Sequence, residues 1–387
     1  MSILRLSVLK DTAYAPLPEG TILMEDYAGG NKANLRGRLD RLSYETQRQV
    51  LDRDPAAFER MAPNLQHYFE RAVPARTSDL RPGAPVVVMV HGFLFDPRQA
   101  VGDDPKESDN PHGRLYHFVE GDEGEEQRHH TSSWPLHLGF SLDDVTGSQG
   151  FAIAFGWHSQ PGFASSLINH FQNFYARAYD YAGQTAWVLV HVLDRLSQVL
   201  PGHPIDLFCH SLGSRVVVRA LQMACSYRPS LLPRLGRVLL LGGAEYVVEA
   251  QVMMRRLLDG NFQSLPSFYN IVSRENDVLD KLGENFGPRT FGNSQVIGHN
   301  GLEAGQKNPN WMDLRIDGRE VQEWMEPRGF QVSGDRPGNI WDHWYYYTFR
   351  GNMRLYREIL RNREDWTLGA LRGQGIPEGA PRGIFGD

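Results

Sequence analysis

The sequence predicts an α/β fold in which a mostly parallel central sheet is flanked by helices on both faces. Two observations support this prediction. Between residues 85 and 361, short apolar runs alternate with longer amphipathic segments, which gives the order strand, helix, strand, helix. The apolar runs, such as PVVVMV and GFAIAF, are continuous rather than interrupted by polar residues, as expected of strands that are buried on both faces.

The first 80 residues contain few strand signals, and we predict that they form a helical appendage with amphipathic helices at 35–50 and 56–72. Residues 81–387 are predicted to form the α/β domain. Residues 96–147 form a long polar insertion within it, and we interpret this insertion as a lid or cap over a binding site.

The α/β domain has a predicted strand or helix at nearly every apolar segment. Strands are predicted at residues 85–90, 150–155, 205–209, 237–241, 268–273 and 313–316. Helices are predicted at residues 175–200, 214–227, 247–258 and 344–361, where apolar residues recur every three or four positions. Ligands of parallel sheets bind at the carboxyl ends of the strands, so candidate functional residues are those that directly follow a strand.

The segment CHSLG, which joins the strand at 205–209 to the next helix, is the most informative motif. Ser211 lies in the turn, and small residues, Cys209 and Gly213, flank it two positions away on either side. This arrangement resembles the nucleophile elbow of α/β hydrolases, in particular of serine esterases and lipases, over about residues 85–364. The α/β-hydrolase family pattern has glycine where this chain has Cys209. The resemblance implies that Ser211 is a nucleophile.

The resemblance also implies that an acid and then a histidine follow the nucleophile along the chain. Asp277, after the strand at 268–273, is the predicted acid, and Glu245 is the alternative. His343, just before the last predicted helix, is the predicted general base, and His299 is the alternative.

An oxyanion hole requires two backbone N–H groups that point at the developing negative charge. Leu212, directly after the nucleophile, is predicted to supply one of them. His91 and Gly92 follow the first strand of the domain and resemble the HG motif of the same family. The second N–H is therefore assigned to Phe93, with Leu94 as the alternative.

Other side chains that follow predicted strands are candidates for the wall of a substrate pocket. They are His91, Leu94, Trp157, His158, His210 and Glu245. The insertion also contains several histidines, but none shows a recognised spacing of metal ligands, so we expect no metal.

The resemblance implies a serine hydrolase that cleaves carboxylic esters through an acyl-enzyme, a reaction that requires no cofactor. Thioesterase, amidase or acyltransferase chemistry on the same residues remains open, as does an inactive binding protein with the same fold. The expected partner is a small-molecule ester, and the oligomeric state stays open.

Composition excludes several other classes of protein. The chain carries 40 basic and 46 acidic residues, a net charge of −6, which argues against a nucleic-acid-binding protein. Its apolar runs are too short to span a membrane, and its N-terminus does not resemble a secretory signal, so we expect a cytoplasmic protein. Two cysteines outside any C-x-x-C pair exclude a disulfide framework.

Overall fold

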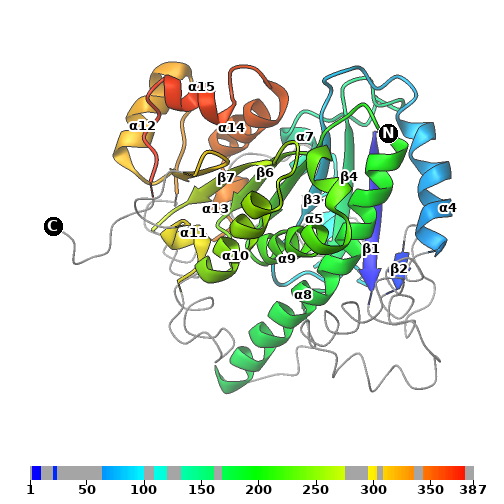
Figure 1. Ribbon diagram of the computed structural model, residues 1–387. Coiled ribbons are helices and arrows are strands. Elements are labelled where there is room, and N and C mark those ends of the chain that lie inside the picture. The colour runs from blue at the N-terminus through cyan, green and yellow to red at the C-terminus, as the bar shows by residue number, and fades with distance from the viewer. Residues whose placement is uncertain are drawn as a thin grey trace.

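An eight-stranded sheet, parallel in every strand pair, forms the centre of the protein (Figure 1). Its strands are β1 (Ile3–Leu9), β2 (Thr21–Leu23), β3 (Val86–Val90), β4 (Phe151–Trp157), β5 (Ile205–His210), β6 (Leu235–Leu241), β7 (Ser267–Val272) and β8 (Trp311–Arg315). Their order across the sheet is β2-β1-β4-β3-β5-β6-β7-β8. The computed structural model describes residues 2–9, 21–23, 63–99, 109–119, 132–160, 168–274, 295–302, 308–334 and 343–379.

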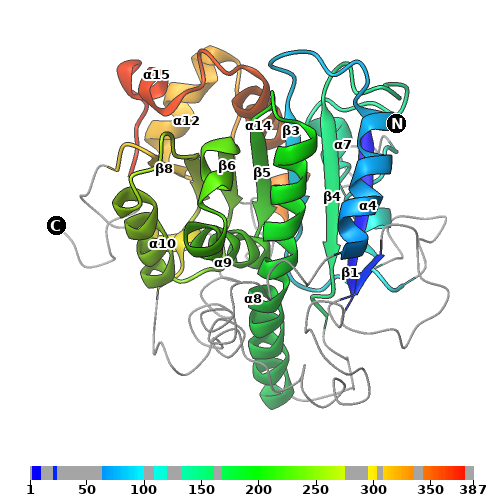
Figure 2. The same cartoon turned by 45° about the vertical axis from the view of Figure 1, so that its right-hand side comes forward.

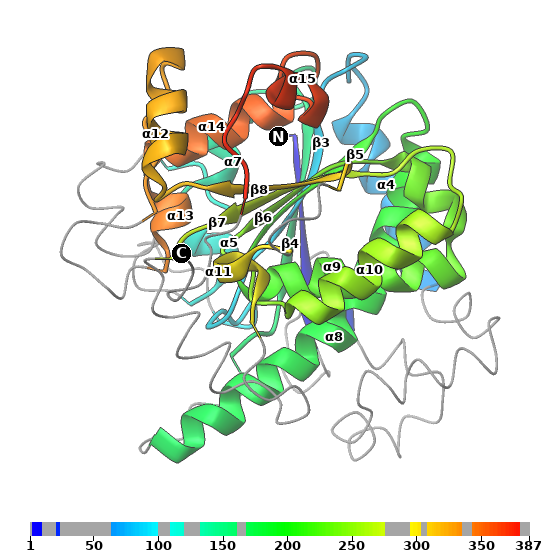
Figure 3. The same cartoon turned by 60° about the vertical axis from the view of Figure 1, so that its left-hand side comes forward.

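Helices cover both faces of this sheet, as Figure 3 shows. One face carries α4 (Pro63–Ala72), α8 (Ile168–Val199), α9 (Leu212–Tyr227) and α10 (Val247–Asp259). The other face carries α5 (Pro111–Arg114), α7 (Trp134–His137), α12 (Arg319–Met325), α13 (Tyr345–Thr348), α14 (Arg350–Arg361) and α15 (Leu368–Gly373). The short helix α11 (Ile297–Asn300) lies beside β7. Each face has its own hydrophobic cluster, so the described part of the chain has three layers.

The six strands predicted from the sequence are all present, and their ends agree within two residues. Every residue of β3, β4 and β5 is buried, which confirms that continuous apolar runs indicate strands covered on both faces. Among the predicted helices, 344–361 is divided into α13 and α14 at Phe349, whose backbone is extended. The predicted helix at 35–50 lies outside the described residues.

The prediction of a helical appendage is wrong for residues 3–9, because β1 pairs with β4 inside the sheet. Arg5 and Ser7 interrupt the apolar run of β1 and weaken its strand signal. Both polar side chains are bound by the insertion: Arg5 donates to the carbonyl of Tyr116 at 3.2 Å, and the Ser7 hydroxyl lies 2.9 Å from His112 Nε2. Only tertiary contacts make these polar groups acceptable in a buried strand.

The described parts of the insertion, 96–99, 109–119 and 132–147, contribute to the hydrophobic layer on one face of the sheet. Tyr116 and Trp134 are fully buried there, and the Trp134 ring packs edge-on against Phe208 with 5.0 Å between centroids. These aromatic residues therefore form part of the core rather than a lid. Residues 100–108 and 120–131 of the insertion lie outside the described residues.

The long helix α8 follows β4 and has 32 residues, which corresponds to a length of about 48 Å. Its first turns extend past the edge of the sheet at which the strands end (Figure 2). No described helix, α8 included, is both long enough and apolar enough to cross a membrane.

The connections of the sheet identify where a ligand is expected. β3 and β5 are neighbours, but the chain continues from β3 to β4 on one side and from β5 to β6 on the other. The segment after β3 packs on the face of the sheet that carries α14. Helix α9, which follows β5, packs on the opposite face of the sheet. Ligands of open α/β sheets bind beyond the carboxyl ends of the strands at such a divergence, which here lies between β3 and β5.

The position of β1 can be tested with Leu6, which is fully buried between the sheet and its helices. We expect Leu6→Ala to lower the free energy of unfolding by about 2–5 kcal/mol, because it leaves a cavity in the core. The matched control is Leu142→Ala, at a residue that is 47% exposed, for which a change within about 0.5 kcal/mol is expected. Urea unfolding followed by tryptophan fluorescence measures both. Equal stabilities of the two variants would contradict the assignment.

Candidate active site

Ser211 occupies a strained turn at the divergence between β3 and β5. It directly follows β5 and precedes the first residue of α9, with φ 53° and ψ −124°. The only other described residues besides glycine with positive φ are Leu94 and Asn261. Such a conformation costs about 1–3 kcal/mol and persists only where surrounding contacts impose it. Leu94 belongs to the loop after β3, so two of the three strained residues lie in adjacent loops.

Backbone hydrogen bonds hold Ser211 in this conformation. Its N–H donates to the carbonyl of Leu241 at the end of β6. Its carbonyl accepts from the N–H groups of Ser214 and Ala244, and all three distances are 3.0 Å. The Ser211 hydroxyl makes no capping hydrogen bond to α9, so a capping role does not account for this serine. The residue is 5% exposed and lies at the positive end of the α9 dipole.

Two glycines, Gly92 in the loop after β3 and Gly213 in α9, are required because the backbones of these two segments nearly touch. A Cβ atom at Gly92, in the loop after β3, would lie 2.7 Å from Ser211 Cβ. A Cβ atom at Gly213 would collide with the carbonyl oxygens of Val90 and His91. Cys209 is small enough for its position, and its Sγ lies 3.3 Å from the Leu239 carbonyl. Gly213 must therefore be small because the end of β3 lies against it.

His91 and Trp157 stabilise this edge of the sheet rather than line an open pocket. Trp157 donates its backbone N–H to His91 Nε2 and its indole N–H to the His91 carbonyl, each at 2.9 Å. Since Nε2 accepts, the proton is on Nδ1, which donates to the Gly92 carbonyl at 2.9 Å. Burial lowers the pKa of His91 to about 3, so the ring is neutral at pH 7.

His210 and His343 lie next to each other beside the elbow. The Nε2–H of His210 donates to the His343 carbonyl at 3.1 Å, and the two ring centroids are 4.5 Å apart. Burial lowers the pKa of His343 to about 3 and also lowers that of His210. No hydrogen bond joins the Ser211 hydroxyl to the His343 ring, although both residues are among those described. The structure therefore connects His343 to the elbow through His210.

The two acids predicted for the site have different outcomes. Asp277 lies outside the described residues. Glu245 is fully buried, and its carboxylate accepts from the Tyr179 hydroxyl at 2.6 Å and from Arg215 at 3.1 Å. A carboxylate bound by an arginine and a tyrosine in this way does not orient a histidine, so the structure does not support Glu245 as the alternative acid or as part of a pocket wall.

The alternative base, His299, is half-buried in α11. The preceding residue, Gly298, packs backbone against backbone on Gly242 and Gly243, in the loop after β6. His299 therefore also belongs to the carboxyl edge of the sheet, on the side of β6 and β7.

The predicted oxyanion residues both lie next to the elbow: Leu212 directly follows Ser211, and Phe93 follows Gly92, whose backbone approaches Ser211. Leu212 is fully buried as the first residue of α9. Phe93 is half-buried, and its ring meets Tyr175 of α8 edge to face, with centroids 5.7 Å apart. Leu94 has φ 75°, a conformation that is rare for a bulky residue.

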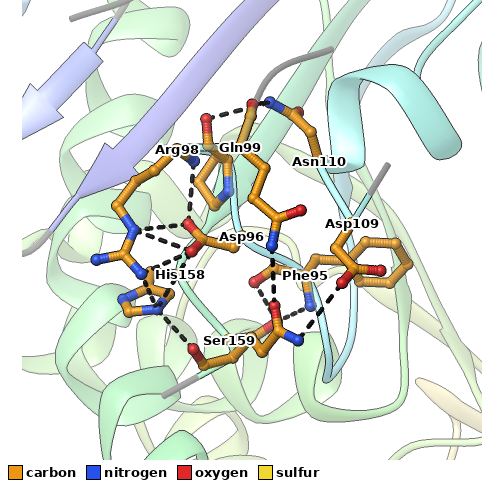
Figure 4. A network of polar contacts seen from close by, with 10 residues as sticks. Phe95, Asp96, Arg98, Gln99, Asp109, Asn110, His158 and Ser159 are labelled. Atoms are coloured by element: carbon orange, nitrogen blue, oxygen red, sulfur yellow. Dashed lines mark hydrogen bonds and ion pairs between the residues drawn. The ribbon is translucent and has the colours of Figure 1, made fainter. Parts of the chain in front are cut away.

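A polar network holds the loop after β3 against the end of β4 (Figure 4). The Arg98 guanidinium donates to both carboxylate oxygens of Asp96, with distances of 2.6–3.0 Å, and lies 3.0 Å from His158 Nε2. Burial opposes the ionisation of Asp96, but the hydrogen bonds and charge of Arg98 and the electrostatic interaction with His158 together outweigh it and lower the pKa. The Ser159 hydroxyl accepts from the Phe95 N–H at 2.9 Å. His158 therefore supports the loop, and sequence reasoning missed Asp96 and Arg98 because no motif contains them.

A buried serine that contacts a histidine ring occurs at Ser7 and His112, but its setting differs from that of Ser211. Ser7 is 2% exposed in the regular strand β1 and has none of the backbone strain of Ser211. Within the described ranges, no cluster of three His, Cys, Asp or Glu side chains could hold a metal ion.

No model of a known protein family matches the chain, and no curated protein matches it. The resemblance to α/β hydrolases therefore stays a prediction that depends on the motifs and on the order of elements.

The close approach at the elbow can be tested with Gly92→Ala. We expect the added methyl group to separate the β3 loop from Ser211 and to lower the free energy of unfolding by about 1–3 kcal/mol. Gly202→Ala is the control, because a Cβ atom there meets nothing within 4 Å. Urea unfolding compares the two. A Gly92 variant as stable as the Gly202 variant would show that the loops are farther apart than described.

Buried histidines predict a loss of stability in mild acid. Burial lowers the pKa to about 3 in His91, His112, His191 and His343, and lowers that of His210 as well. The unfolded chain, with histidine pKa values of about 6.5, then takes up protons first as the pH falls. The free energy of unfolding is therefore expected to fall below about pH 6.5, by up to about 1.4 kcal/mol per pH unit for each histidine.

Urea unfolding at about pH 7.5 and pH 5.5 measures this effect above the range in which most carboxylates titrate. The control is His191→Leu, on α8 and remote from the elbow. It is expected to reduce the difference in the free energy of unfolding between the two pH values by the contribution of one histidine. Equal free energies of unfolding at the two pH values would contradict the burial of these rings.

Proposed function

We propose that this chain is a serine hydrolase that cleaves carboxylic esters, with Ser211 as its nucleophile. The observation that carries the proposal is the position of Ser211 at the divergence between β3 and β5. It combines positive φ, a hydroxyl that does not cap α9, and a glycine on each side that permits close backbone approach. These are the features of a nucleophile elbow, in which strain exposes a serine hydroxyl at the end of a strand.

In the proposed reaction, the Ser211 hydroxyl attacks the ester carbonyl carbon and transfers its proton to His343. The backbone N–H groups of Leu212 and Phe93 bind the oxyanion of the tetrahedral intermediate. The C–O bond to the leaving alcohol then breaks, and the alcohol takes the proton from His343. A water molecule then gives a proton to His343 and attacks the acyl carbon. The bond from this carbon to the Ser211 oxygen breaks, and His343 returns the proton to Ser211. Asp277 is assigned to orient the His343 ring.

Two properties of the described residues support these roles. His343 lies beside the elbow: its carbonyl accepts from His210, the residue before Ser211, and the two rings are 4.5 Å apart. Leu212 is the first residue of α9, where the unpaired N–H groups and the helix dipole favour a developing negative charge. Hydrogen bonds in unliganded active sites are often long and tighten with substrate, so the separation of Ser211 and His343 is compatible with the proposal.

The same residues would also cleave thioesters or amides, or transfer the acyl group to an acceptor other than water. The choice among these depends on the groups that bind the leaving group and the acceptor, not on the nucleophile. The ester reaction is preferred because the resemblance is to serine esterases and lipases.

Labelling with a fluorophosphonate probe, followed by peptide mapping, tests the proposal. We expect covalent labelling of Ser211 in the native chain, no labelling of Ser211→Ala, and labelling that is slower in His343→Ala by about 10²-fold or more. The probe reacts only with a serine whose hydroxyl is activated as a nucleophile.

Ser7→Ala is the matched control, because it removes a buried serine whose hydroxyl lies 2.9 Å from the His112 ring. It is expected to be labelled at the rate of the native chain. A folded native chain that takes no label, or a label that persists in Ser211→Ala, would overturn the proposal and favour an inactive binding protein.

A further inference from the structure

A buried group of charged residues lies beside the loop that binds the Ser211 carbonyl, and the proposed reaction does not use this group. Glu245 follows β6 and is fully buried. Its carboxylate accepts from Tyr179 of α8, from Arg215 of α9 and, at 2.9 Å, from the N–H of Tyr246. Three elements that are far apart in the sequence are thus joined by one carboxylate.

The charges of this group are balanced by neighbouring side chains. Arg219, one turn after Arg215, lies 3.6 Å from Glu245 and pairs with Glu249 at 2.8 Å. The Arg215 guanidinium also lies over the Tyr179 ring, 3.4 Å from its centroid. A buried ion pair contributes little net stability compared with apolar residues of similar size, so its presence is better explained by the geometry that it imposes.

We propose that Glu245 is a positioning residue for Ser211, an inference that depends on the proposed function. Arg215 lies four residues after Ser211, in the first turns of α9. Ala244, next to Glu245, donates its N–H to the Ser211 carbonyl at 3.0 Å. The Glu245–Arg215 pair therefore closes a ring of contacts that runs from Ser211 along α9, across the ion pair and back through Ala244. This ring holds the backbone of Ser211 in its strained conformation.

The loop that carries Glu245 is also anchored on its other side. Gly298 donates its N–H to the Gly243 carbonyl, and Ile297 donates to the Glu245 carbonyl, both at 2.9 Å. These backbone bonds do not involve the Glu245 side chain. A substitution that removes only the charge thus leaves the loop in place and loosens its connection to α9.

Tyr179 extends the same connection to α8. One turn earlier on that helix, Tyr175 contacts Phe93, the residue assigned to the oxyanion hole. The carboxylate of Glu245 therefore links the nucleophile turn to the helix that contacts the β3 loop. Tyr179→Phe removes the 2.6 Å hydrogen bond and keeps the ring on which Arg215 packs.

The experiment compares Glu245→Gln and Tyr179→Phe with the native chain. The readouts are the second-order rate constant for fluorophosphonate labelling of Ser211 and, with p-nitrophenyl butyrate, kcat and KM separately. A misplacement of the nucleophile by about 1 Å reduces the rate by about 10²-fold, which is the loss expected in kcat and in labelling for Glu245→Gln. KM is expected to change by less than about threefold, because the substrate-binding groups are unchanged. Tyr179→Phe is expected to show a smaller loss of the same kind.

Asp206→Asn is the matched control. Asp206 is also fully buried, pairs with Arg363 and accepts the Arg237 N–H at 2.7 Å, but it lies near the start of β5, at the opposite end of that strand from Ser211. This variant is expected to lose stability and to keep the native labelling rate. The labelling rate could instead fall in both variants in proportion to their loss of stability. That result would show that Glu245 has a merely structural role.

The outcomes separate the inference from the proposed function. A native chain that is labelled on Ser211, with folded Glu245 and Tyr179 variants labelled equally fast, overturns the inference alone. A native chain that takes no label overturns both. If Glu245→Gln does not fold, Glu245→Asp decides, because it keeps the buried charge and shortens the side chain that reaches Arg215. Native labelling of a folded Glu245→Asp variant would overturn the inference.

Discussion

The close contact between the ends of β3 and β5 is the constraint on which the rest of this site depends. Gly92 and Gly213 bring the backbone of one loop against the other, and Ser211 turns between them with positive φ. No single contact maintains this conformation. The Ser211 N–H donates to the end of β6, and the Ser211 carbonyl accepts from the loop after β6. That loop is bound in turn to α8 and α9 through Glu245. The strain at the serine is thus imposed by four neighbouring elements.

Buried polar groups connect the layers of the fold at several places. Arg5 and Ser7 of β1 are bound by the segment after β3, His91 is bound by Trp157, and His210 is bound by the carbonyl of His343. Each of these groups would be costly in an apolar interior without its partner. They specify which element lies beside which, and the neutral histidines among them make the folded state sensitive to acid.

Much of the fold could be predicted because its strands are buried on both faces. The continuous apolar runs at β3, β4 and β5 and the periodic helices that follow them indicate an α/β sheet without further information. The strand signal of β1 is weak because its polar residues are acceptable only beside partners more than a hundred positions away in the chain. The sequence likewise does not indicate that aromatic residues of the insertion belong to the core, since their burial depends on the sheet that they cover.

The strand-to-helix turn at Ser211 could be predicted from the sequence, because an apolar strand, small residues around a serine and an amphipathic helix follow one another along the chain. The contact that makes Gly213 necessary is with Val90 and His91, far away in the chain, and depends on the tertiary structure. The roles of the surrounding polar residues depend on contacts that form only in the folded chain. Glu245 and His158 both follow strands, and both are equally suitable candidates for chemistry on that ground. Their partners assign Glu245 to an arginine of α9 and His158 to an arginine of the β3 loop. A charged side chain acquires its role from the groups within hydrogen-bonding distance, and the spacing of residues along the chain does not contain that information.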